Sequence, residues 1–237
     1  MINLLLCGNE KVFDGALTEL ISIINRTSEV INCYIFTAEL TRIKPEYTPI
    51  KDEQVDFLNE VVKRKNQKNK VTKIDVTKIY ENEFKNCVNE GAYCTPYTLL
   101  RLFADLVPEI PDKLLYLDID IMVGRDITQL FNINIEEYEY AAVKEKYGCW
   151  LIRPDYINAG MLLLNMKKIK ETGLLKKARE KIKTKKMLFA DQDAVYWSTT
   201  KKKILPRIYN EQSKFNKKDT VICHFCKRLM FLPYPHT

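Results

Sequence analysis

Residues 114–123 read Leu-Leu-Tyr-Leu-Asp-Ile-Asp-Ile-Met-Val, an apolar segment that contains two carboxylates. An apolar run of this length predicts a strand buried on both faces in the middle of an α/β sheet. Because burying unpartnered carboxylates is costly, we expect Asp118 and Asp120 to emerge at the end of this strand or to be neutralised. A turn with two solvated acids is the alternative, but the immediate return to an apolar Ile-Met-Val favours the strand.

The spacing of the two aspartates predicts that they share a direction. Side chains alternate along extended chain, so Asp118 and Asp120 point to one side while Ile119 points back into the core. Two hard oxygen donors at the carboxyl edge of a central strand would form half of a divalent-metal site.

Length and composition predict one α/β domain over residues 1–237, without internal repeats or a low-complexity linker. No apolar run reaches the length of a membrane-spanning helix, and residues 1–7 lack the features of a signal peptide. Seven irregularly spaced cysteines favour reduced thiols and a cytoplasmic location.

The net charge of +7 is concentrated between residues 167 and 186, where ten basic residues face only Glu171 and Glu180. Three interpretations of this charge compete: a solvated helix face, binding to an anionic membrane surface, and binding to nucleic acid. Leu175, Ala178 and Ile182 keep helical spacing, which puts the lysines on an outer face. Without aromatic residues between the basic ones, nucleic acid is disfavoured.

Strand and helix patterns alternate, which predicts β-α-β units with a mostly parallel sheet and right-handed crossovers. We expect strands over residues 2–7, 30–37, 71–76, 140–143 and in the second part of 156–166. We expect helices over residues 17–24, from Asp52 as N-cap, over 97–106, from 127, over the Lys-rich segment and after 190.

Three polar residues occupy informative places in this pattern. Arg101 lies in an apolar helix, where its guanidinium either extends to the surface or binds an anionic partner. Asp191 is expected to cap the helix that follows it. His224 follows a short apolar run, which predicts that it lies at a strand end. A lone histidine is more often structural than a ligand, but two aspartates that lack a third ligand favour a metal role. The surrounding Cys-x-x-Cys is weak evidence for zinc or redox chemistry.

Four motifs together resemble glycosyltransferase family 8, the group of glycogenin and bacterial lipopolysaccharide galactosyl- and glucosyltransferases. They are Leu-Tyr-Leu-Asp-Ile-Asp at 115–120, Tyr-Ile-Asn-Ala-Gly-Met-Leu-Leu-Leu-Asn at 156–165, Ala-Asp-Gln-Asp at 190–193 and Cys-His-Phe-Cys at 223–226. The resemblance implies a GT-A fold with a mixed, mostly parallel sheet flanked by helices. It also implies a UDP-glucose or UDP-galactose donor, Mn²⁺ with Mg²⁺ as the alternative, and retention of anomeric configuration.

The resemblance also implies roles for individual residues. Asp118, Asp120 and His224 match the metal ligands. The residues that match donor contacts, in addition to the two aspartates, are Cys7, Gly8, Asn9, Thr98, Arg101, Ile119, Asn158, Ala159, Asp191, Gln192 and Lys227. Gln192, Asp191 and Arg101 match the positions assigned to catalysis.

Two departures from the family pattern stand out. Gly8 and Asn9 replace the acidic residues that often receive the nucleoside. The Gly-x-x-Lys-Pro-Trp segment that follows the family's histidine is absent, so either Lys227 or Arg228 replaces its lysine or the chain lacks the C-terminal lid. The basic, membrane-associating extension of the family is also absent from this sequence.

The resemblance implies a retaining hexosyltransferase that acts on a hydroxyl of a glycan or lipid-linked acceptor in bacterial cell-surface polysaccharide synthesis. A divalent cation would stabilise the leaving diphosphate as a Lewis acid, and Mn²⁺ suits the carboxylate and imidazole set. We expect a cytoplasmic protein, peripheral at the inner face of the membrane through its lysines. The alternatives are a haloacid-dehalogenase-like phosphatase, which the mid-chain position of the Asp-x-Asp motif disfavours, and a non-catalytic nucleotide-sugar- or glycan-binding protein.

Overall fold

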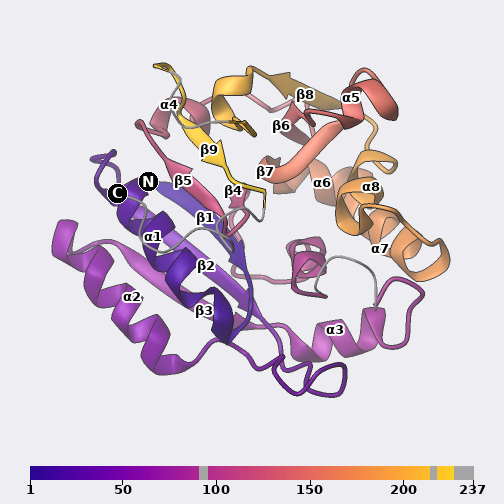
Figure 1. Cartoon of the computed structure of the whole chain (residues 1–237), viewed down its shortest axis with the longest axis horizontal. Helices are drawn as coiled ribbons and strands as arrows, with labels where there is room; N and C mark the ends of the chain where they lie inside the picture. Colours follow the sequence, from indigo (N-terminus) through magenta and orange to yellow (C-terminus); the bar gives the residue numbers. More distant parts are fainter. Residues whose placement is uncertain (91–95, 214–217, 227–237) are drawn as a thin grey trace.

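A seven-stranded sheet with strand order β3-β2-β1-β4-β7-β6-β8 runs through the molecule (Figure 1). The computed structural model describes residues 1–90, 96–213 and 218–226. The strands of this sheet are β1 (Ile2–Cys7), β2 (Ile31–Thr37), β3 (Lys70–Asp75), β4 (Lys113–Leu117), β6 (Tyr140–Lys144), β7 (Ile157–Asn165) and β8 (Lys202–Leu205). A second, two-stranded sheet pairs β5 (Ile121–Val123) with β9 (Ile222–His224).

The main sheet is mixed and mostly parallel, as predicted. Strands β3, β2, β1 and β4 pair in parallel, β7 runs antiparallel to both β4 and β6, and β8 is parallel to β6. The β-α-β units predicted for the N-terminal half are present, because α1 connects β1 to β2 and α2 connects β2 to β3.

Helices cover both faces of the sheet. They are α1 (Phe13–Ile24), α2 (Asp52–Lys65), α3 (Thr77–Phe84), α4 (Thr128–Phe131), α5 (Gly148–Leu151), α6 (Met166–Thr172), α7 (Leu174–Thr184) and α8 (Ala190–Tyr196), with 3₁₀ turns η1 (Glu10–Val12), η2 (Pro96–Phe103) and η3 (Arg207–Tyr209). Alternate residues of β1 face opposite ways: Leu4 and Leu6 pack with α1, α2 and α4, whereas Leu5 packs with α3, η2 and α6–α8. This is the pattern of a strand buried on both faces.

The Asp-x-Asp segment corrects one prediction, because it is a turn and not part of a continuous strand. Strand β4 ends at Leu117 and β5 begins at Ile121, so both aspartates lie in the connection. Continuing in the main sheet would bury both carboxylates between helix layers, which is costly. The Ile-Met-Val that favoured a continuous strand instead pairs with β9, with Ile121 opposite His224.

Smaller differences concern element boundaries. Residues 96–103 form the 3₁₀ turn η2 where a helix to 106 was expected. Asp52 is the first residue of α2, so the N-cap is Lys51. The Lys-rich segment forms two helices broken at Gly173, whose φ of 67° suits glycine, and Leu175, Ala178 and Ile182 are buried as predicted.

Two further predictions concern the membrane and the thiols. Among the described helices, none is both long and apolar enough to cross a membrane. The six cysteines in the described ranges are all free thiols, in agreement with the prediction of reduced cysteines.

Candidate metal and donor site

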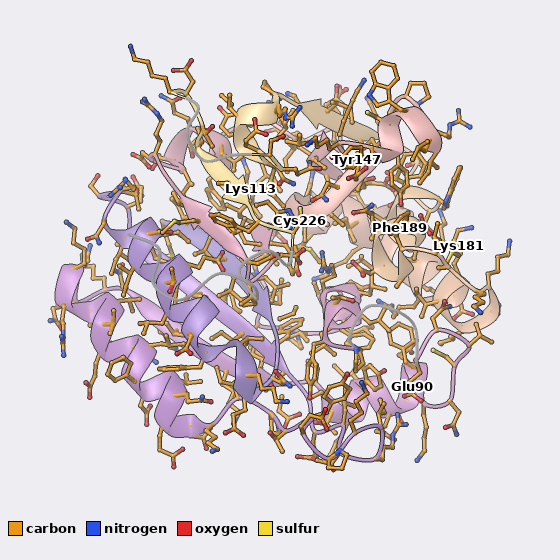
Figure 2. All side chains as sticks on the ribbon, viewed as in Figure 1. Glu90, Lys113, Tyr147, Lys181, Phe189 and Cys226 are labelled. Atoms are coloured by element: carbon orange, nitrogen blue, oxygen red, sulfur yellow. The ribbon has the colours of Figure 1, made fainter. Side chains whose placement is uncertain are left out.

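Asp118, Asp120 and His224 converge although the histidine comes from a distant strand. Their candidate ligand atoms all lie within 4.8 Å of one another. The Nε2 atom of His224 is 3.1 Å from Asp120 Oδ1 and 3.6 Å from Asp118 Oδ2. An octahedral cation with bonds of about 2.1 Å separates neighbouring ligand atoms by roughly 3 Å. The three side chains therefore fit a small divalent cation. Cys226, two residues beyond the end of β9, is labelled near the centre of Figure 2.

Gly160 of β7 allows this close approach. A Cβ atom at this position would lie 2.1 Å from Cε1 and 2.6 Å from Nδ1 of His224, and 2.9 Å from Oδ2 of Asp118. These separations are far inside van der Waals contact. The positions of His224 and Asp118 therefore leave no room for a side chain at the glycine of the Asn-Ala-Gly motif. The same residue's carbonyl accepts the amide of Asp118 at 2.8 Å, which fixes the start of the turn.

His224 is buried and oriented by Asn158. Its Nδ1 atom lies 3.2 Å from Asn158 Oδ1, which leaves Nε2 toward the aspartates. Burial alone would lower the pKa of His224, but the hydrogen bond with Asp120 and the charges of Asp120 and Asp118 outweigh it and raise the pKa well above its usual value. A cation bound at Nε2 would displace a proton from that nitrogen.

Arg101 is buried and faces the two acidic groups of the site. Its guanidinium donates to Asp118 Oδ1 at 2.7 Å, to the carbonyls of Ala159 and Thr98, and lies 3.2 Å from Asp191 Oδ2. Of the two alternatives left by the sequence, the anionic partner is the one observed. Since its donors are used within the protein, Arg101 holds Asp118 and Asp191 in place.

Asp191 differs from its predicted role as a helix cap. Helix α8 has Phe189 as its N-cap without a side-chain cap, and the Asp191 carboxylate instead pairs with Arg101 and the hydroxyl of Thr98. Burial raises the pKa of Asp191 to about 6, although the Arg101 guanidinium lowers it. The buried carboxyl group of Asp191 therefore changes charge near pH 6.

Gln192 is held next to the same strand. Its Oε1 accepts the amide of Ala159 at 3.0 Å, and its Nε2 donates to the hydroxyl of Tyr156 at 3.2 Å. The Tyr156 hydroxyl in turn donates to Asp193, whose other oxygen accepts the amide of Phe189. The Asp-Gln pair and the Asn-Ala-Gly motif are therefore one connected unit.

The end of β1 contributes the remaining positions. Cys7 and Asn9 are buried, and the side chain of Asn9 accepts the amide of Lys11 and so begins η1. Burial raises the pKa of Cys7, with the charges of Arg101, Asp118 and Asp191 acting on it, so this thiol is neutral and close to the site. Ile119 packs on the core and faces Gly15 as expected, although it does so from a turn and not from an extended strand. Lys227 and Arg228 lie outside the described residues.

Tyr116 and Asn210 lie near the candidate metal ligands but were not identified from the sequence. The hydroxyl of Tyr116 donates to Asp118 Oδ1 at 2.5 Å, and its ring lies 3.9 Å from the guanidinium of Arg101. Its spacing of two from Asp118 could have revealed it, because alternate residues share a side. Asn210 donates to Asn158 at 2.9 Å and carries no local signal at all.

A comparison with protein families matches residues 3–230 to the model of glycosyl transferase family 8. The chain belongs to glycosyltransferase family 8. The resemblance drawn from four short motifs is thereby confirmed over nearly the whole chain.

Two named relatives are longer than this chain. Glycosyltransferase GlyA of Streptococcus pneumoniae is 35% identical over 118 residues, which cover 46% of this chain and 16% of that protein. The lipopolysaccharide 1,3-galactosyltransferase of Salmonella typhimurium is 28% identical over 152 residues, 56% of this chain and 45% of that protein. The chain thus spans less than half the length of either relative.

Solved structures of glycosyltransferases share the fold. The galactosyltransferase LgtC, in complex with donor and acceptor sugar analogues, matches with a TM-score of 0.69 at 16% identity, over 95% of this chain and 87% of that one. Glycosyltransferase GlyE of Streptococcus pneumoniae matches with a TM-score of 0.67 at 20% identity, over 94% of this chain and 54% of that one. The predicted GT-A fold is confirmed by these neighbours.

Proposed function

We propose that this family 8 chain is a retaining hexosyltransferase that moves glucose or galactose from a UDP-sugar to a hydroxyl of a glycan or lipid-linked acceptor. The observation that carries the proposal is the convergence of Asp118, Asp120 and His224 beside the Arg101 and Asp191 pair. Asp118, Asp120 and His224 would hold Mn²⁺, with Mg²⁺ as the alternative. When bound, the cation supplies Lewis-acid stabilisation of the leaving diphosphate.

The chain's own residues would orient the donor. Arg101 fixes Asp118 and Asp191, so neither carboxylate needs to reorganise when the donor arrives. Asp191 would accept a hydrogen bond from a sugar hydroxyl, a contact that strengthens as the ring flattens. Gln192, whose amide is a poor nucleophile, would shield the developing positive charge while the departing phosphate accepts the acceptor's proton.

The identity of the substrates is part of the same proposal. A relative named as a lipopolysaccharide galactosyltransferase supports galactose as the donor sugar and a lipid-linked glycan as the acceptor. The exposed lysines of α6 and α7 would place the enzyme on an anionic membrane surface, at the cytoplasmic face of the cell membrane.

Thermal melts with Mn²⁺, with UDP and with both together test the proposal. A ligand at a hundred times its dissociation constant adds about 2.7 kcal/mol to the free energy of unfolding. We expect stabilisation that needs both ligands and is lost in Asp118→Asn. The matched control is Asp126→Asn, because Asp126 is exposed and, within the described ranges, accepts hydrogen bonds only from Thr128. An absence of synergy in the native chain would overturn the metal-dependent donor site.

Turnover assays separate the alternatives. Release of UDP from UDP-galactose or UDP-glucose that requires Mn²⁺ supports the transferase. Hydrolysis of an aryl phosphate would support the phosphatase, which family membership already disfavours. Synergistic binding without any turnover on offered glycan acceptors would support a binding protein.

A further inference from the structure

A buried chain of hydrogen bonds leads from Asn210 to the candidate metal ligand His224. The Nδ2 group of Asn210 donates to Asn158 Oδ1 at 2.9 Å, and the same oxygen lies 3.2 Å from His224 Nδ1. The exposed fractions of Asn210, Asn158 and His224 are 0%, 8% and 4%, so bulk water does not compete for these contacts.

The direction of this chain of hydrogen bonds is fixed by a third donor. The backbone amide of Gly160 also donates to Asn158 Oδ1, at 2.9 Å. Because an N–H can only donate, the Asn158 atom that it meets must be the amide oxygen. An oxygen in that place accepts from His224, so Nδ1 carries a proton and the lone pair of a neutral imidazole lies on Nε2. Nε2 is the atom that faces Asp118 and Asp120.

In this arrangement the side-chain oxygen of Asn210, Oδ1, is buried and remains without a hydrogen-bond partner among the described residues. Leaving a buried carbonyl without a partner is unfavourable. Rotating the amide by half a turn would bring two oxygens together and leave Asn158 without this donor. The side chain is therefore stable in one orientation only, with its NH₂ toward Asn158.

The backbone holds Asn210 beside the histidine strand. Asn210 directly follows η3, and its neighbour Glu211 donates its amide to the carbonyl of Ile222 at 2.9 Å. The amide of His224 donates back to the carbonyl of Glu211, also at 2.9 Å. Asn210 and His224 are thus carried by two paired segments, which sets their separation.

We propose that Asn210 is a positioning residue that acts through Asn158 to keep the proton of His224 on Nδ1 and its Nε2 available to a divalent cation. The inference rests on the proposed function, because it concerns the same candidate cation. Partners that orient a ligating histidine commonly contribute 10- to 100-fold in metal affinity, so an effect in that range is expected.

Two substitutions at this position should differ in degree. Asn210→Leu removes the donor but leaves Gly160 and His224 on the Asn158 oxygen, so we expect the dissociation constant for Mn²⁺ to rise several-fold. Asn210→Asp instead places a carboxylate acceptor against that oxygen. The amide of Gly160 still holds the oxygen in place, so the two acceptors repel and the Asn158 side chain shifts away from His224 Nδ1. We expect the dissociation constant to rise by about 10- to 100-fold.

Mn²⁺ alone, titrated into the full chain and followed by the paramagnetic resonance signal of the free ion, is the first readout. The matched control is Asn69→Leu. Asn69 is equally buried and bonds through both amide atoms, to Ile31 N and Val62 O, far from the site. We expect both leucine variants to lose stability and only Asn210→Leu to lose Mn²⁺ affinity. Equal Mn²⁺ affinity in the native chain and both Asn210 variants would overturn the proposal.

The histidine ring gives a second readout that needs no cation. The sequence holds two histidines, so His236→Gln leaves the signals of His224 alone in a nitrogen-15 spectrum. We expect a slowly exchanging Nδ1 proton in the metal-free native chain and faster exchange in Asn210→Leu. Slow exchange that is unchanged in the variant would contradict the role of Asn210. Failure of the native chain to bind Mn²⁺, with this proton still protected through Asn210, would instead overturn the proposed function and leave the hydrogen-bond chain intact.

Discussion

Gly160 lies where any side chain would strike two candidate metal ligands. For Gly160→Ala we expect loss of Mn²⁺ binding, because the new Cβ would lie 2.1 Å from His224 Cε1. Overpacking of this kind costs about 1–3 kcal/mol of stability. Mn²⁺ titration and urea unfolding measure the two effects.

Gly173→Ala is the control for this substitution. Gly173 has open space around it but a φ of +67°, so alanine there costs about 1–2 kcal/mol in backbone strain without touching the site. Comparable destabilisation of both variants with Mn²⁺ affinity retained in both would contradict the steric role of Gly160.

Asp191 predicts a pH dependence of stability. Its pKa of about 6 in the folded chain exceeds the reference value of 3.8, so as pH rises the unfolded chain loses its proton first. The contribution of Asp191 is complete below pH 3.8 and is lost as pH rises to about 6. At 1.36 kcal/mol per pKa unit, the loss is about 3 kcal/mol.

The comparison with Asp191→Asn isolates this effect, because other titrating groups are common to both chains. We expect the free energy of unfolding of the variant, minus that of the native chain, to rise across this range and to level off above it. Urea titrations at several pH values measure the difference. A difference independent of pH would mean that Asp191 stays ionised when folded.

At the scale of elements, the position of η2 depends on α7. Arg179 of α7 donates to the carbonyl of Leu102 and pairs with Asp105, just after η2, and its side chain is only 5% exposed. Because η2 carries Thr98 and Arg101, this contact helps to hold both residues in their positions at the site. The lysines of α7 were noticed in the sequence, whereas its buried arginine was not.

Arg179→Ala should therefore unfold more easily. Removing one partner of a buried ion pair costs about 3–5 kcal/mol, since Asp105 is left unpaired. Lys177→Ala, on the exposed side of the same helix, should change stability by less than about 0.5 kcal/mol. Urea unfolding of both variants measures the contrast, and similar values for the two would show that the ion pair contributes nothing.

The Asp-x-Asp turn shows where prediction from sequence ended. The apolar residues on both sides of the two aspartates predicted one continuous strand, whereas the structure has two, β4 and β5. Their separation into different sheets was not predicted, because it depends on β9, whose residues lie far along the chain. Local periodicity records that a segment is buried and extended, but not which strand it pairs with.

At the scale of the whole molecule, we expect residues 1–237 to unfold as one unit. Each of the two core clusters joins strands from the N-terminal and the C-terminal halves of the chain: Leu5 of β1 shares one with Leu162 of β7, and Leu4 shares the other with Met161. Separate unfolding of either half would expose both cores. Far-ultraviolet and near-ultraviolet circular dichroism should therefore give coincident urea transitions, whereas two separated transitions would indicate two domains.

The sequence by itself determined the α/β class, the main strands and the family. Both kinds of signal, apolar runs typical of buried strands and short functional motifs, consist of residues that are neighbours in the sequence. The sequence also singled out Asp118, Asp120 and His224 as unusual at strand ends. Only the tertiary structure decided that Arg101 turns inward to two acids and that Asn210 reaches His224 through Asn158. These contacts join segments distant in sequence, and the free energy that selects them arises from packing that no local pattern records.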